Sequence, residues 1–187
     1  MKKALSLLAL SLLPWSAVQA ADTFEIDPVH SSILFKIRHL DVADFYGRFN
    51  EIKGTISFDK ESAEKSSVTA EVPVESVDTH NDKRNQHLKS PDFFNAKQFP
   101  TISFKSTKVQ KEGEDFKVTG DFTLHGVTKS ITVEFEKVGE GKGMQGETRA
   151  GGKAEFKIKR SDYGMNFMLN GLGDEVEITL SLEGVKK

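Results

Sequence analysis

The sequence contains no cysteine. Disulfide bonds, thiolate metal sites and thiol nucleophiles are therefore excluded. The chain is long enough to bury an apolar core without cross-links, so the missing thiols indicate one domain held together by packing alone. The sequence also has no GxSxG nucleophile elbow and no HxxxH pair of zinc ligands. We therefore predict a protein without a catalytic residue or a metal site, and an enzyme with scattered catalytic residues stays an alternative.

An excess of positive charge is also missing. The chain has 26 basic and 28 acidic residues, and its formal net charge of −2 becomes −4 if Lys2 and Lys3 are removed with the N-terminal segment. Binding to nucleic acid or to an anionic membrane surface requires basic residues in surplus on one face. We therefore predict no nucleic-acid partner and no stable insertion into a membrane.

The N-terminal segment has the pattern of a secretory signal peptide. Two lysines precede an apolar run, and the small residues Val18 and Ala20 stand where signal peptidase cleaves. Pro14 interrupts the run before it reaches the roughly 20 residues that a membrane span needs. We predict that residues 1–20 are removed near Ala20 and that residues 21–187 form the mature domain in the periplasm. A retained N-terminal anchor is the alternative.

Aromatic residues are almost all phenylalanine. The chain has 14 Phe but only 2 Tyr and 1 Trp, and the single Trp15 belongs to the N-terminal segment. Phenylalanine contributes a large apolar area without a polar tip. This bias predicts an interior that excludes water.

Apolar residues alternate with polar ones through most of the mature chain, which is typical of half-buried β-strands. Short polar turns, for example at residues 111–114 and 139–143, indicate antiparallel neighbours. The polar run 81–100 is the exception, and it predicts a helix that is capped by Thr79 or Asn81 and ends at Ser90, before Pro91. Eight strands are expected, near residues 24–40 (broken at Pro28), 52–58, 68–75, 102–104, 116–124, 131–135, 154–158 and 176–182.

Eight such strands can pack as a sandwich or close into a barrel, and alternation does not decide between the two. An eight-stranded barrel is either just filled by side chains or holds one small ligand.

Several segments resemble the YceI-like family. They follow one another in order and cover the mature chain: IDPVHSSILFKIRHL at 26–40, HLKSPDFF at 87–94, PTISFKST at 100–107, GDFTLHGVTK at 120–129 and RSDYGMN at 160–166. The resemblance implies an all-β, lipocalin-like, eight-stranded antiparallel β-barrel with one helix inserted between strands. It further implies a periplasmic protein, often a homodimer, whose lumen holds a polyisoprenoid chain, an isoprenoid quinone or another long-chain lipid, with no other cofactor required. Asn85 departs from the family pattern, which usually has Asp after Arg84.

The expected function is binding and carriage of such a lipid. Alternatives are an enzyme that acts on a lipid or quinone in the same cavity and a stress-related interaction protein with a filled core. We expect the lumen to be lined by inward-facing strand positions, namely Phe35, Ile37, Ile52, Phe58, Val72, Phe104, Phe122, Phe156, Ile178 and Leu180.

Polar side chains that could meet a lipid head group are Arg38, His39, Tyr46, Arg84 and His87. A guanidinium suits phosphate, and an imidazole can donate to a quinone carbonyl. Two alternatives are that Arg38 faces solvent, and that Arg84 and His87, three residues apart on one helix, only hold that helix against the barrel.

Overall fold

The computed structural model describes residues 21–187. The signal peptide predicted for residues 1–20 lies outside the described part of the chain. The strands form a single sheet, and four short helices lie between them. These are the α-helix α1 (Asp82–Leu88) and the 3-10 helices η1 (Ala63–Lys65), η2 (Val74–Ser76) and η3 (Arg160–Tyr163). The strands of the sheet are β1 (Asp22–Ile26), β2 (Ser32–His39), β3 (Ala43–Phe49), β4 (Lys53–Phe58), β5 (Ser67–Pro73), β6 (Val77–Asp78), β7 (Thr101–Glu112), β8 (Asp115–Leu124), β9 (Val127–Lys142), β10 (Thr148–Lys159) and β11 (Leu172–Lys186).

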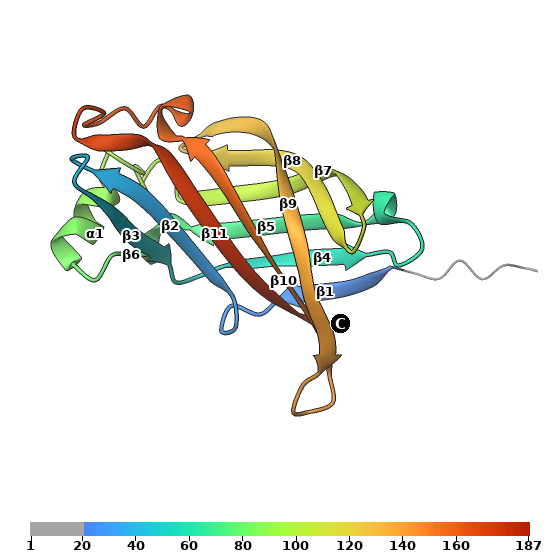
Figure 1. Cartoon of the computed structure of the whole chain (residues 1–187). Coiled ribbons are helices and arrows are strands. Elements are labelled where there is room, and N and C mark those ends of the chain that lie inside the picture. Colours follow the sequence, from blue (N-terminus) through green and yellow to red (C-terminus); the bar gives the residue numbers. More distant parts are fainter. Residues whose placement is uncertain (1–20) are drawn as a thin grey trace, which may run out of the picture.

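Eight of these strands close into a barrel (Figure 1). The order β1-β4-β5-β7-β8-β9-β10-β11 is antiparallel throughout, and β1 pairs with β11 to complete the ring. The prediction of an eight-stranded antiparallel barrel with one helix is confirmed. Closure leaves no open edge within the ring, so the alternating apolar face of each strand points into one shared interior.

The remaining strands extend the sheet beyond the ring. β2 pairs with β11 from residue 172 to 181, β3 pairs with β2, and the two-residue β6 pairs with β3. The predicted first segment is thus two strands separated at Pro28, and both halves share one edge of β11. β3, with the sequence ADFYGRF, was not predicted as a strand. The predicted turn at residues 139–143 is wrong, since β9 continues to Lys142.

The helix caps one end of the barrel. Asn81 is the N-cap residue, and its Oδ1 accepts the backbone N–H of Arg84 at 3.0 Å. The helix ends at Leu88, two residues before the predicted end at Ser90. Figure 1 shows α1 at one end of the barrel and the β7–β8 turn at the other. No helix within residues 21–187 has the length and apolar character needed to cross a membrane.

Candidate functional site: an apolar cavity inside the barrel

The barrel encloses a cavity of about 230 Å³. Every strand of the ring contributes to its wall, together with residues of β2 and β3. On β8 the wall extends from Phe116 to Phe122, which corresponds to a strand length of about 20 Å. Side chains of Phe, Ile, Val, Leu and Ala make up most of this wall. A long space with such a wall fits a hydrocarbon chain better than a compact polar ligand.

Nine of the ten residues predicted for the lumen line this cavity. They are Phe35, Ile52, Phe58, Val72, Phe104, Phe122, Phe156, Ile178 and Leu180. Ile37 is buried but does not line the cavity. It pairs with Phe45 and Val176 on the part of β2 that lies past the last lining residue of that strand, Phe35. An inward-facing position on β2 is therefore not sufficient for a residue to line the cavity, because the cavity ends before the strand does.

The prediction omitted several other lining residues. Phe24 and Phe49 belong to β1 and β3, which were not recognised as separate strands. Other lining residues, for example Phe116 and Phe135, stand at inward positions of the predicted strands, so the alternation of those strands could have identified them. Lys137 and Glu140 also line the cavity, and these two charged residues were not considered.

Three lumen phenylalanines lie over glycines of adjacent strands. A Cβ on Gly47 would overlap the ring of Phe35, a Cβ on Gly120 that of Phe104, and a Cβ on Gly152 that of Phe135. None of these glycines has a positive φ angle, so they are needed for space and not for backbone conformation. The rings can thus lie close to the barrel wall, and the space at the centre stays open.

The cavity is closed at the end near α1. Phe93, Val74 and Tyr163 are buried there. The ring of Phe94 packs edge-on against Phe49 with centroids 5.5 Å apart, and Tyr163 packs in the same way against Phe122 at 5.6 Å. Most polar lining residues gather at the opposite end, where Ser57, Ser66, Lys137 and Glu140 lie. The site is therefore a tunnel with one apolar closed end and one polar end.

None of the five predicted head-group residues lines the cavity. Arg38 is half exposed and pairs with Asp44 at 3.1 Å, and His39 and Tyr46 are exposed. The His87 ring contacts Asp92 through Nε2 at 2.9 Å and packs edge-on against Phe93. These side chains belong to β2, β3 and α1, and not to the polar end of the tunnel.

Arg84 fastens the helix to the extended sheet. Its guanidinium carbon lies 4.4 Å from the centroid of the Phe45 ring, and the guanidinium donates to the hydroxyl and the carbonyl of Thr79 at 2.9 and 2.6 Å. Asn85 accepts from both the backbone N–H and the hydroxyl of Thr79, at 2.9 and 2.6 Å. The amide thus supplies the acceptor that a carboxylate would supply at this position.

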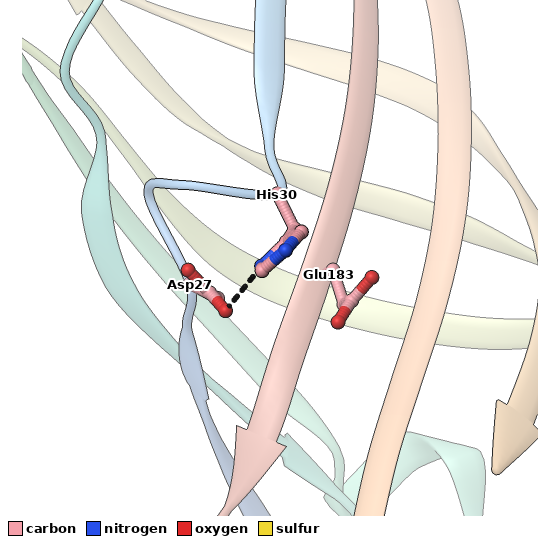
Figure 2. A group of neighbouring side chains, drawn as sticks. All are labelled: Asp27, His30 and Glu183. Carbon is pink, nitrogen blue, oxygen red and sulfur yellow. Dashed lines mark hydrogen bonds and ion pairs between the residues drawn. The ribbon is translucent and has the colours of Figure 1, made fainter. Parts of the chain in front are cut away.

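One group of side chains has the geometry of a possible metal site. Asp27, His30 and Glu183 bring their ligand atoms within 4.8 Å of one another (Figure 2). Arg149, however, donates from Nη1 to Asp27 at 2.8 Å and to Glu183 at 2.5 Å. Its guanidinium supplies the positive charge that a metal ion would supply. Hydrogen bonds from His30 and Arg149 hold the pKa of the Asp27 carboxyl well below its usual range.

Comparison with known proteins identifies a single family. The sequence model of the YceI-like domain matches residues 24–184. The chain is 39% identical over 190 residues to the Escherichia coli protein YceI, and the match covers 100% of both chains. The Campylobacter jejuni YCEI structure has a TM-score of 0.72 and 34% identity, over 80% of this chain and 89% of that one. A polyisoprenoid binding domain from Saccharophagus degradans has a TM-score of 0.69 at 18% identity, over 90% of this chain and 100% of that one, and shows the shared fold.

Proposed function

This chain belongs to the YceI-like family, and from that premise we propose that it binds a long-chain isoprenoid lipid, either a polyprenyl chain or an isoprenoid quinone, in the lumen of its barrel. The observation that carries the proposal is the tunnel of about 230 Å³ with its apolar wall. A neighbour of the same fold is described as a polyisoprenoid binding domain, which agrees with this choice of ligand.

The wall alone can supply the binding energy. Burial of hydrocarbon contributes about 0.8 kcal/mol per methylene, so ten buried carbons contribute about 8 kcal/mol before the costs of binding are subtracted. An empty apolar cavity of this kind stays dry, so a guest chain displaces little ordered water. An interaction protein with a filled core, the alternative considered from the sequence, would not need such a space.

We further propose that the lipid is carried outside the cytoplasm. The signal-peptide pattern of residues 1–20 motivates this step. N-terminal sequencing of the protein from the periplasmic fraction should find a mature chain that begins at Ala21. An uncleaved chain that sediments with membranes would contradict the proposal.

The lipid-binding proposal is tested by mass spectrometry of the protein purified from cells. We expect an isoprenoid lipid in the solvent extract and in the native spectrum. The variant A154F puts a large ring into the tunnel from β10, where Ala154 is 4% exposed. It should abolish uptake of a labelled prenyl chain.

The matched control is E155F, which places the same ring on the outer face of the same strand. It should bind the prenyl chain like the unmodified protein. Equal uptake by both variants, or a wild-type protein that is always free of lipid, would contradict the proposal. Overpacking in A154F should lower the free energy of unfolding by about 1–3 kcal/mol. Thermal unfolding of both variants checks that each is still folded.

A further inference from the structure

The apolar stripe of β9 ends in two charged residues that both face the tunnel. Ile131, Val133 and Phe135 line the wall, and Lys137 is the next residue of the same parity. The register with β10 then shifts, so that Gly152 pairs with Lys137 and Gly151 with Gly139. The extra residue, Val138, is 68% exposed. This β-bulge returns Glu140 to the inner face, since a bulge reverses the alternation that follows it.

Both residues lie opposite small residues of β10, and the ring of Phe135 lies over one of these, Gly152. Lys137 lies opposite Gly152 and Glu140 opposite Ala150. Residues directly opposite in an antiparallel pair point to the same face, so no bulky neighbour on β10 covers either charge. The Lys137 ammonium lies 5.7 Å from the centroid of the Phe58 ring, which itself lines the tunnel. The ammonium is thus held beside the apolar wall.

A chain of ion pairs forms the rim of this end, and we call its members Asp22, Lys60, Lys137, Glu140 and Lys186 the charged rim. Asp22 pairs with Lys186 at 2.6 Å and with Lys60 at 3.3 Å. Glu140 pairs with Lys60 at 3.4 Å and with Lys137 at 3.7 Å. Asp22 lies opposite Phe58, and Lys186 lies opposite Phe24, so both belong to the lumen-facing side of their strands.

Lys137 is the least compensated member of the charged rim. Its one ion pair, with a carboxylate that it shares with Lys60, is the longest of the four and exceeds hydrogen-bond distance. The neighbouring Asp115 carboxylate accepts the backbone N–H of Lys137 at 3.2 Å. Among the described residues that line the tunnel, Lys137 alone carries an ammonium, and its N–H donors are free to bind an acceptor.

We propose that Lys137 binds the polar head of the lipid through acceptor oxygens, while the prenyl chain occupies the tunnel behind it. This inference rests on the proposed function and places the head group at the end opposite α1. A phosphate or a hydroxyl oxygen supplies the acceptor, and an ammonium forms a stronger hydrogen bond with the anionic oxygen. The geometry thus places the head-group contact at Lys137 on β9, and not at the predicted residues on β2, β3 and α1.

The test uses three probes and the delipidated mature protein: geranylgeranyl monophosphate, geranylgeraniol and the headless hydrocarbon squalene. In native mass spectrometry titrations, K137M should weaken binding of a headed probe about tenfold, the usual effect of losing a charged hydrogen bond, and leave squalene unchanged. K137R, which keeps the donors, should restore affinity. Loss for the phosphate alone identifies an anionic head, and loss for both headed probes identifies any acceptor oxygen.

The matched control is K153M on β10. Lys153 faces outward and pairs with Glu136 at 3.2 Å, so its loss should change no affinity. The head-group inference is overturned if K137M binds both headed probes as the wild type does, or if it weakens squalene equally. If the wild type binds none of the three probes, the proposed function itself fails, and the two failures are therefore distinguishable.

Discussion

The ring of Phe35 lies over Gly47, its partner on the neighbouring strand β3, and covers the place where a Cβ would stand. The atoms that a Cβ would meet first all belong to the far end of the Phe35 side chain. G47A should therefore rotate this ring away from β3 and into the tunnel. We expect a loss of about 1–3 kcal/mol in the free energy of unfolding, as for other overpacked cores, together with weaker lipid uptake.

The double variant G47A/F35L tests whether overlap with the Phe35 ring causes the loss of both stability and lipid uptake. Leucine lacks the ring atoms that overlap the new Cβ, so both stability and uptake should recover in part. Urea denaturation followed by far-UV circular dichroism measures stability, because the only tryptophan, Trp15, is in the segment predicted to be removed. If G47A alone has the stability of the wild type, the glycine is not needed for this ring.

Sequence periodicity predicted the strands and most of the tunnel lining because a period of two fixes the face to which each side chain points. That the strands close into a barrel was implied by the resemblance to the YceI-like family. Periodicity could not predict that the tunnel ends short of Ile37, since this depends on the phenylalanines packed beneath α1. It also could not place Glu140, because the bulge after Lys137 depends on pairing with β10. Arg38 and Arg84 were chosen as head-group candidates for their chemistry, and only the three-dimensional structure separates them from the tunnel.

The carboxylate of Asp27 should make stability depend on pH. His30 and Arg149, both at 2.8 Å from its Oδ2, hold its pKa below the value of about 3.9 that it has in an unfolded chain. A depressed folded pKa gives stability that is present above about pH 4 and is lost as the pH falls through the folded pKa. The unfolding free energy of the wild type should therefore exceed that of D27N at pH 6, and the difference should shrink below pH 4.

Urea denaturation of both proteins between pH 6 and pH 2 measures this difference. D41N removes the same charge from an exposed turn and controls for net charge. A difference between wild type and D27N that stays constant down to pH 2 would show that the carboxylate is not held by its partners.

Arg160 should be a strong determinant of stability although it has no carboxylate hydrogen-bonded to its guanidinium. It is 3% exposed, and it donates to four backbone carbonyls at 2.8 to 2.9 Å, those of Met165, Phe167, Leu172 and Gly173. R160M leaves these acceptors without their donor, so we expect a loss of about 2–4 kcal/mol in the free energy of unfolding. Hydrogen exchange should accelerate in residues 164–173. R160K has an ammonium whose three donors sit on one nitrogen, so it cannot reproduce the spread of the guanidinium and should recover less than half of the loss. Full recovery would contradict this role of the planar guanidinium.

Substitution of Arg84 distinguishes a residue that positions the helix from one that binds a head group. R84M loses the cation–π contact with Phe45 and both hydrogen bonds to Thr79, so the unfolding free energy should fall by about 1–3 kcal/mol. Its affinity for geranylgeranyl monophosphate should equal that of the wild type when measured well below the unfolding transition, because Arg84 does not line the tunnel. R84K keeps the charge but not the planar stack, and should be destabilised to an intermediate degree. A selective loss of affinity for the phosphate probe in R84M, with stability unchanged, would instead place the head group at the helix end and would contradict its assignment to Lys137.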